Sequence, residues 1–463
     1  MDYLKSRRQL LFQLLPVFFI LIAIIAATAN QKNIKQWLVG ALGQEANITI
    51  NTQSSQGPMQ YPWRNLSQGG ESKDWRLAPL TNQVRALQTE YIRLDHLYDF
   101  YDIVRKDSTG LQFDFTKLDV ILNEIRAAGA TPYLSLSYIP PALAVNGDIT
   151  APPANWAEWQ VVVERTIEHV SGTRNTPNVY YEVWNEPDLF GNYKTYGDRN
   201  YLTMYQYAAQ GAKNAKVSQP YKIGGPAITA LYRNWVDGVL NLAIQQDLPL
   251  DFFSWHRYNE DIDVFRTDVS TVRQWLSAYP TKSNIELHIT EWGHTPANDE
   301  GYDNQFGAIH TIAVSTELIG TVDKAFVFEI QDGKDPAGKT RWGRWGLIDS
   351  AGQSKPRYSA LQFLDRLKGD RVQLLGRGTW VKGAASRDGN EILTVLANYD
   401  PTGKHFETVP VTWTGVSPGS YELTQQFFGS QSRVQQVATS GSSLKIDVPM
   451  SANSALFLRL RPL

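Results

Sequence analysis

Short apolar runs alternate along most of the chain with segments in which apolar residues recur every three or four positions. Runs such as Val179–Trp184 are typical of buried β-strands, whereas segments such as Phe115–Ala128 are typical of amphipathic helices. The pattern predicts eight strands, each followed by a helix. The strands are expected at 47–51, 90–94, 131–137, 179–184, 222–225, 252–256, 285–290 and 324–330. Such alternation favours parallel βαβ units, and eight units fit an α/β (β/α)8 TIM barrel.

The helices of this barrel are expected at 77–89, 115–128, 156–170, 201–215, 235–246, 272–278, 306–318 and 356–367. A doubly wound open sheet is the structural alternative. That fold usually carries a glycine-rich turn after an early strand, and the sequence has no G-x-G-x-x-G motif.

The pattern changes from Asp370 onward, where short alternating segments are bounded by turns such as Asp388-Gly389 and Pro418-Gly419. Strands are expected there at 379–381, 392–397, 407–412, 421–427, 443–448 and 454–460. This arrangement predicts a C-terminal antiparallel β-sandwich domain.

The N-terminus has the pattern of a membrane-targeting segment. Lys5, Arg7 and Arg8 precede an apolar run from about Leu10 to Ala29 that ends in a small-x-small pattern. The run is long for a signal peptide and near the ~20 residues that span a bilayer. An uncleaved signal anchor and a cleaved signal peptide both stay open. In either case the catalytic part is expected to be exported, either membrane-anchored or secreted and periplasmic. The predicted divisions are a targeting segment at 1–29, a linker at 30–46, the barrel at 47–368 and the sandwich at 369–463.

Composition narrows the function further. A formal net charge of -2 gives no electrostatic footprint for nucleic acid. The absence of cysteine excludes disulfides, thiolate metal sites and a cysteine nucleophile. The 14 Trp and 22 Tyr either fill a large core or line a sugar cleft, where flat rings stack on sugars.

Two glutamates carry the strongest chemical signal. Glu186 lies in Trp-Asn-Glu-Pro at the end of the fourth predicted strand, and Glu291 lies in Thr-Glu-Trp-Gly at the end of the seventh. Residues at the carboxyl ends of barrel strands face the active site. Either glutamate alone reads as a solvated loop residue or an ion-pair partner. Together they suit a pair that flanks a glycosidic bond, ~5–5.5 Å apart for retention or ~6.5–9.5 Å apart for inversion.

These motifs resemble the acid/base and nucleophile motifs of the clan A glycoside hydrolases. The longer string 181–189 resembles family 39, which includes β-xylosidases and α-iduronidases, as do 222–227, 252–258, 345–349 and 355–358. The resemblance covers roughly 47–463 and implies that Glu186 is the acid/base and Glu291 the nucleophile. The chain also resembles exported endoglycosidases that act on biofilm exopolysaccharides.

The resemblance implies supporting roles for four further residues. Asn185 would bond the 2-hydroxyl of the sugar, and Arg93 would hold Glu291 ionised. His256 and Tyr258 would orient the carboxylates, with Tyr258 bonded to Glu291. Ordinary packing is the alternative for His256 and Tyr258.

Aromatic residues beside the predicted strand ends are candidates for substrate binding. Tyr61–Arg64 is placed in the loop after strand one, and Arg341–Trp345 in the loop after strand eight. Anchoring of long loops is the alternative role for these rings. The substrate-binding candidates are Trp63, Trp292, Trp342 and Trp345.

The preferred interpretation is a retaining, endo-acting glycoside hydrolase that cleaves an exported polysaccharide or oligosaccharide, since long loops favour an open cleft. One alternative is an exo-acting, β-xylosidase-like enzyme. The other is a non-catalytic saccharide-binding protein that works with a polysaccharide biosynthesis or export complex. No cofactor or metal is expected, because His288 and Glu291 would point to opposite faces of their strand.

Overall fold

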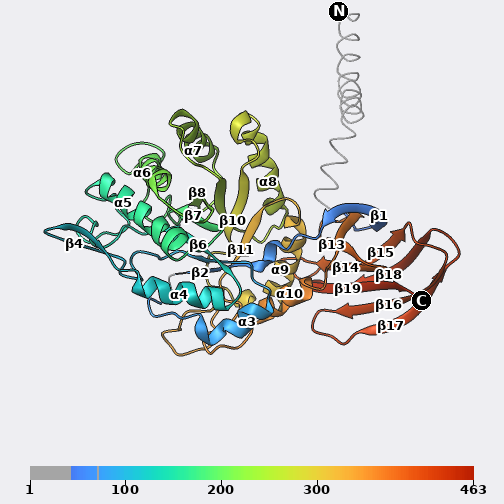
Figure 1. Cartoon of the computed structure of the whole chain (residues 1–463). Coiled ribbons are helices and arrows are strands. Elements are labelled where there is room, and N and C mark those ends of the chain that lie inside the picture. The colour runs from blue at the N-terminus through green and yellow to red at the C-terminus, as the bar shows by residue number, and fades with distance from the viewer. Residues whose placement is uncertain (1–42, 70–71) are drawn as a thin grey trace, which may run out of the picture.

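The computed structural model describes residues 43–69 and 72–463. They form a closed eight-stranded barrel with helices around it and a separate nine-stranded sheet (Figure 1). The predicted targeting segment at 1–29 lies outside the described residues, as does most of the predicted linker, so membrane attachment and export stay predictions. Among the helices of the described ranges, none is long and apolar enough to cross a membrane.

The barrel is built from parallel strands that close in the order β10, β11, β2, β3, β6, β7, β8, β9. Its strands are β2 (Asn65–Gln68), β3 (Tyr91–Leu94), β6 (Thr131–Leu136), β7 (Val179–Val183), β8 (Tyr221–Ile228), β9 (Phe252–Tyr258), β10 (Glu286–Gly293) and β11 (Lys324–Phe328). Because all eight run in the same direction, their carboxyl ends meet at one mouth of the barrel. The TIM-barrel prediction is confirmed, and β7 and β10 are the fourth and seventh strands as expected.

Helices cover the outside of the barrel. They are α3 (Thr81–Ala86), α4 (Thr116–Ala127), α5 (Trp156–Ile167), α6 (Tyr201–Asn214), α7 (Arg233–Gln245), α8 (Asp263–Leu276), α9 (Gln305–Leu318) and α10 (Pro356–Leu364). A hairpin, β4 (Val104–Asp107) and β5 (Gly110–Phe113), precedes α4. Most of these helices bury one apolar face, but α9 is buried all round from Gly307 to Leu318. It contacts both the barrel helices and the second sheet, so it has no solvent-facing side.

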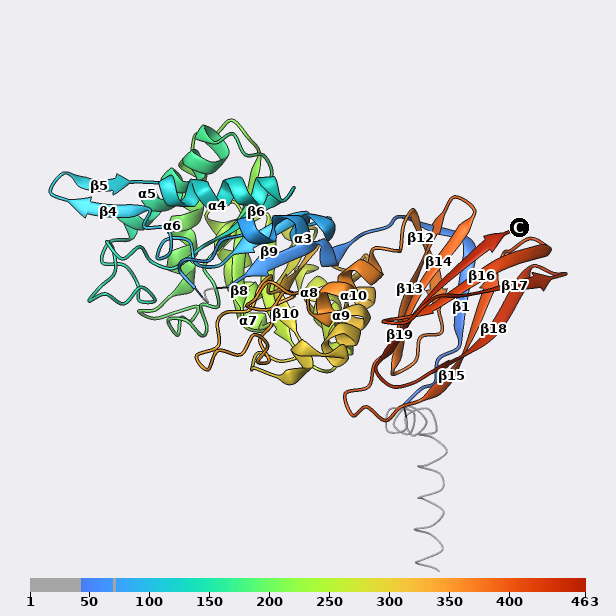
Figure 2. The same cartoon turned by 90° about the horizontal axis from the view of Figure 1, so that it is seen from below.

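The strand predicted at 47–51 exists, but its assignment to the barrel is wrong. β1 (Ile48–Pro58) pairs with two strands of the second sheet, as the blue strand in Figure 2 shows. The first barrel strand is β2, whose sequence Asn-Leu-Ser-Gln holds one apolar residue. Its polar side chains point into the active-site end of the barrel, where Ser67 and Gln68 bond to Arg93 and Glu329. That polarity removes the hydrophobic signal from which a strand is predicted.

The second sheet has the order β17, β16, β19, β14, β13, β12, β1, β15, β18. Beyond β1, its strands are β12 (Asp370–Leu375), β13 (Val381–Asp388), β14 (Glu391–Asn398), β15 (Glu407–Thr414), β16 (Gly419–Phe427), β17 (Arg433–Thr439), β18 (Ser443–Met450) and β19 (Ser454–Pro462). Every second residue of β15 is buried. Among these residues, Val411 and Trp413 share a core with Ile50, Leu423 and Leu458. The sheet is antiparallel except where β1 runs parallel to β15, so the predicted sandwich gains a strand from the other end of the chain.

Candidate active site

Polar side chains from four barrel strands meet at the carboxyl mouth of the barrel. Arg93 lies near the end of β3, and Asn185 and Glu186 follow directly after β7. His256 comes from β9 and Glu291 from β10. All but Glu186 are buried, so the strands hold these groups in fixed positions rather than on free loops.

The turn after β7 aims the Glu186 side chain into the mouth. Trp184 and Glu186 have φ angles of 76° and 44°, a left-handed conformation that residues other than glycine rarely adopt. Neighbouring strands hold this turn: Ser135 Oγ donates to the Trp184 carbonyl at 2.6 Å, and the Glu186 amide donates to the Ala227 carbonyl at 3.0 Å. Strained backbone that its surroundings hold in place is a feature of functional sites.

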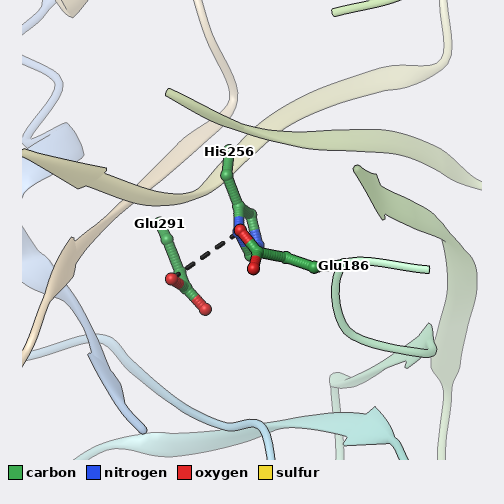
Figure 3. A group of neighbouring side chains, drawn as sticks. All are labelled: Glu186, His256 and Glu291. Carbon is green, nitrogen blue, oxygen red and sulfur yellow. Dashed lines mark hydrogen bonds and ion pairs between the residues drawn. The ribbon is translucent and has the colours of Figure 1, made fainter. Parts of the chain in front are cut away.

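The carboxyl groups of Glu186 and Glu291 approach each other beside His256 (Figure 3). One ligand atom from each of these three side chains lies within 4.8 Å of the other two. A closest approach of this size fits the separation of ~5–5.5 Å that accompanies retention, not the ~6.5–9.5 Å that leaves room for water in inversion.

The Glu291 carboxylate is held on both oxygens. Arg93 Nη1 donates to Oε1 at 2.9 Å, and the Tyr258 hydroxyl donates to Oε2 at 3.0 Å. His256 Nδ1 lies 3.6 Å from Oε2. The predicted bonds from Arg93 and Tyr258 are therefore present. They fix the carboxylate in one orientation, as a nucleophile that attacks one carbon atom requires.

Arg93 is itself fixed by a second set of acceptors. Its Nε donates to Glu182 at 2.7 Å, and its Nη2 donates to the Asn185 side-chain oxygen at 2.7 Å. Arg93 and Glu182 are completely buried. A buried guanidinium needs paired acceptors, and Glu182 supplies the charge that Glu291 alone would otherwise have to supply. The expectation that Glu182 pairs with a barrel cation is confirmed.

Glu186 has the environment of an acid that keeps its proton. The pKa of Glu186 is raised to about 8, chiefly by burial and also by the nearby Asp188 carboxylate, while Arg93 opposes the shift. His256 Nδ1 lies 2.9 Å from Glu186 Oε1 and fixes the carboxyl group. Burial lowers the pKa of His256, so its imidazole is neutral at neutral pH.

The two carboxyl groups differ in what opposes burial. The pKa of Glu291 is raised to about 7, chiefly by burial, against the opposing effect of the Arg93 guanidinium. Within residues 43–69 and 72–463, Glu186 receives no hydrogen bond from an arginine or lysine side chain. When the pair holds one proton, the proton therefore resides on Glu186, and Glu291 is ionised. This is the division between a general acid and a nucleophile.

Replacement of Asp188 by asparagine should move the basic limb of the kcat/KM–pH profile to lower pH. Glu186 is expected to act in its protonated form, and removal of the negative charge at Asp188 lowers the pKa of that group. The expected displacement is roughly half to one pH unit, measured by initial rates across pH 5–10 on a glycoside with a poorly activated leaving group.

Asp198→Asn is a matched control for this measurement. Asp198 is an exposed carboxylate between β7 and α6, and it is not among the charges that act on Glu186. Its replacement should leave both limbs in place. A basic limb that moves equally in both variants, or in neither, would contradict the electrostatic role of Asp188.

A cavity of about 640 Å³ opens at the catalytic pair. Besides Glu186 and Glu291, Asn185, Tyr258 and Trp345 contribute to its lining. His256 and Arg93 are fully buried, and they contact Glu186 and Glu291 respectively. The structure thus gathers Glu186, Glu291, Asn185, Arg93, His256, Tyr258 and Trp345 in one place, as predicted.

The other three predicted aromatic residues do not line this cavity. Trp63 precedes β2, at the opposite end of the barrel, where its indole donates to Asp365 at 2.8 Å. Its assignment to substrate binding is wrong, because it followed from taking β1 as the first barrel strand. Trp292 is also misassigned: it is fully buried beside Phe265, since neighbouring strand residues face opposite sides. Trp342 is half-buried and anchors its loop through a bond from Nε1 to the Gly333 carbonyl.

Several cavity residues were not foreseen from the sequence, and four of them lie at the ends of barrel strands. Asp95 and His96 follow the end of β3, Tyr138 follows β6, and Phe328 ends β11. Asp95 is buried, and within residues 43–69 and 72–463 its Oδ1 has no hydrogen-bond partner, so it is available to a sugar hydroxyl. Position directly after a barrel strand was the available signal for all four.

The site also has the composition of a cation site, since Glu186, His256 and Glu291 are potential ligands. Their other contacts argue for proton transfer instead. The Arg93 guanidinium already places a positive charge 2.9 Å from Glu291, where it would repel a bound cation. His256 Nδ1 is engaged with Glu186. The arrangement therefore suits two carboxyl groups of unequal pKa better than a metal centre.

The sequence is similar to a family of known glycosidases. A family model described as "Glycosyl hydrolases family 39" matches residues 46–409. The chain is 27% identical over 360 residues to a β-xylosidase of Caldicellulosiruptor saccharolyticus, which covers 71% of this chain and 72% of the relative. It is 26% identical over 387 residues to a β-xylosidase of Geobacillus stearothermophilus, at 70% and 74% coverage.

The fold has close counterparts among solved structures. A monomeric β-xylosidase from Caulobacter crescentus CB15 superposes with a TM-score of 0.73 at 21% identity, covering 90% of this chain and all of that one. A bacterial orthologue of human α-L-iduronidase superposes with a TM-score of 0.64 at 14% identity, covering 91% of this chain and 84% of that one. Both likenesses include the barrel together with the second sheet, since they extend over nine-tenths of the chain.

Proposed function

Because this chain belongs to glycosyl hydrolases family 39, we propose that it is an exo-acting, β-xylosidase-like glycosidase. It is a retaining glycoside hydrolase, which leaves the non-catalytic saccharide-binding interpretation without support. The observation that carries the proposal is the pair of carboxyl groups, Glu186 and Glu291, within 4.8 Å of each other in one cavity. The expected endo action on a long polysaccharide is less well supported than release of single sugars.

The size of the cavity supports exo action. A volume of about 640 Å³ lies within the roughly 300–1,000 Å³ of sites that enclose a small molecule. Phe328 and Trp345 line it, and their rings contact each other with centroids 5.4 Å apart. Such a cavity suits one sugar and its leaving group rather than several sugars on each side of the bond.

In the first proposed step, a carboxylate oxygen of Glu291 attacks the anomeric carbon of the terminal sugar. The bond from that carbon to the leaving oxygen breaks, and the Glu186 proton moves to that oxygen. The products are a sugar ester on Glu291 and the free leaving group. Because the pKa of Glu186 is raised, its carboxyl group still holds this proton near neutral pH.

In the second step, ionised Glu186 removes a proton from water while the water oxygen attacks the same carbon. The ester bond breaks, Glu291 is released as carboxylate, and the sugar leaves with its original configuration. Two inversions at one carbon give net retention. Arg93 and Tyr258 stabilise the departing carboxylate through their bonds of 2.9 Å and 3.0 Å.

Asn185 is proposed to bond the 2-hydroxyl of the sugar. It lines the cavity together with the two glutamates, and its side-chain oxygen accepts a hydrogen bond from Arg93 at 2.7 Å. Its amide nitrogen lies 3.2 Å from the Tyr138 hydroxyl. These contacts leave Asn185 in one rotamer, which favours a fixed contact with the substrate.

Digestion of β-1,4-xylohexaose labelled at its reducing end tests exo action. We expect free xylose and labelled pentamer within the first few per cent of conversion, because one unlabelled sugar at a time leaves the non-reducing end. Chromatographic sizing at early times gives the result. Labelled fragments of two to four sugars appearing before the pentamer would contradict exo action and return the assignment to an endo-acting hydrolase.

A further inference from the structure

Large apolar side chains are exposed on one side of the catalytic cavity. Leu189, Phe190 and Tyr232 are 54%, 40% and 42% exposed, and all three line the cavity. Ala230 extends the same lining. Single exposed apolar residues are ordinary, but several around one hollow mark a place where an apolar group binds. We call Leu189, Phe190, Ala230 and Tyr232 the apolar wall.

The apolar wall is tied to the catalytic acid. The amides of Leu189 and Phe190 donate to the Glu186 carbonyl at 3.0 Å and 2.7 Å, so this stretch and the acid form one turn. Asp188 accepts the Thr229 amide at 3.0 Å and thereby joins this turn to the loop after β8. The wall's other two residues, Ala230 and Tyr232, lie on that loop. The wall therefore stands beside the group that protonates the leaving oxygen.

Other residues that line the cavity have a different chemistry. Glu291, Asn185, Tyr258 and Asp95 present carboxylate, amide and hydroxyl groups to the position of the reacting sugar. A hydroxyl-rich sugar needs such partners, because a buried polar group without a hydrogen bond is costly. The cavity is therefore polar where the sugar binds.

The apolar wall offers few such partners. The side chains of Leu189, Phe190 and Ala230 neither donate nor accept hydrogen bonds. The hydroxyl of Thr229, which also lines the cavity, already bonds to Asp188. An alkyl or aryl group in this place would bury apolar surface against these side chains.

We propose that the leaving-group side of this site binds an apolar aglycone, so that the natural substrate class is a glycoside of an alkyl or aryl alcohol. The proposal rests on the proposed function, since it takes Glu186 as the group beside the leaving oxygen. It adds a recognition element that the catalytic pair alone does not provide.

The test compares kcat/KM for octyl β-xyloside and methyl β-xyloside. Both leaving groups are primary or methyl alcohols of similar basicity, so their ratio reports aglycone binding and not leaving-group chemistry. At ~0.8 kcal/mol for each buried methylene, partial burial of the octyl chain should favour it by about tenfold or more. Leu189→Asn and Tyr232→Ser should each lower that ratio severalfold. Because both kcat/KM values in the ratio are measured on the same variant, a change in its fraction of folded protein cancels.

Tyr196→Ser is the matched control. Tyr196 lies on the same segment between β7 and α6 and is 70% exposed, but it does not line the cavity, so the ratio should stay unchanged. A parent ratio near one would overturn the proposal. An equal loss on xylobiose and octyl xyloside in Leu189→Asn would also overturn it, because the wall would then be a sugar subsite. If neither xyloside is cleaved, xylose is refuted as the sugar that the site accepts. The octyl-to-methyl ratio is then measured on the glycoside that the enzyme does cleave, and it tests apolar aglycone binding there.

Discussion

Glu291→Ala should lose hydrolysis of an aryl β-xyloside by about 10⁴-fold or more in kcat, because it removes the carboxylate that forms the sugar ester. Arg93 and Tyr258 keep their places but have no nucleophile to hold. Added azide should restore turnover, since the truncated side chain leaves room for an anion beside the Arg93 guanidinium. Azide then attacks the anomeric carbon directly while Glu186 protonates the leaving oxygen. That single displacement yields a glycosyl azide of inverted configuration, which proton NMR identifies.

Glu317→Gln provides the matched control. Glu317 is a buried glutamate on α9 that pairs with Arg377 and Arg266, and it lies outside the lining of the catalytic cavity. Its replacement should leave kcat within about threefold at a temperature well below the unfolding midpoint, and unaffected by azide. Parent-like activity in Glu291→Ala, or an azide product of retained configuration, would refute Glu291 as the nucleophile.

Glu186→Ala should have an effect that depends on the leaving group. For alkyl xylosides, whose oxygen needs a proton, kcat/KM should fall by about 10²–10⁴-fold. For a 2,4-dinitrophenyl xyloside, which leaves unprotonated, the first step should stay near the parent rate. Water is then no longer activated, so the sugar ester accumulates, and stopped-flow measurement should record a burst of dinitrophenol.

Azide gives the complementary result in this variant. It attacks the sugar ester on Glu291 without needing a base, so its product should have retained configuration, opposite to that of Glu291→Ala. The basic limb of the pH profile should also disappear, since the group with a pKa of about 8 is gone. Equal losses on all leaving groups, with no burst, would show that Glu186 is not the acid/base.

Much of the barrel and its catalytic pair was predictable from local pattern. Seven of the eight barrel strands follow apolar runs that stand out from the helices between them, and β7 and β10 carry Glu186 and Glu291 at the expected ends. The prediction succeeds because barrel strands are buried on both faces and the strand-end position is fixed by the fold. Their approach to within 4.8 Å depends on barrel closure, which the count of strands correctly implied.

The errors came from places where local pattern and tertiary position disagree. β1 alternates apolar and polar residues as a half-buried strand should, but that pattern does not say which sheet it joins. β2 is polar because it faces the active site, so it gave no signal. The misplacement of Trp63 followed from that single error, since the residues just before the true first strand lie at the far end of the barrel.

The chemistry of the leaving-group side could not be predicted either. Leu189 and Tyr232 are 43 positions apart in the chain, and each alone is an unremarkable loop residue. Only their common exposure at one cavity distinguishes them from core residues of the same type. Exposure is set by the packing of the loops after β7 and β8, which the sequence pattern does not encode.

The pairing of β1 with β12 and β15 has a consequence for how the protein is made. On the ribosome β1 emerges before any barrel strand, whereas its partners emerge only after the whole barrel has been synthesised. Until then its backbone groups and the apolar side chains of Ile48 and Ile50 have no sheet to join, which makes the nascent chain prone to misassociate. The second sheet can form only when β12 and β15 pair with β1. It is therefore completed only after the whole barrel has been synthesised. A polypeptide starting at 369 would lack this strand, and β12 and β15 would each have an unpaired edge. The second sheet therefore joins the segment before the barrel to the segment after it, and the residues from 369 onward do not form the complete sheet alone.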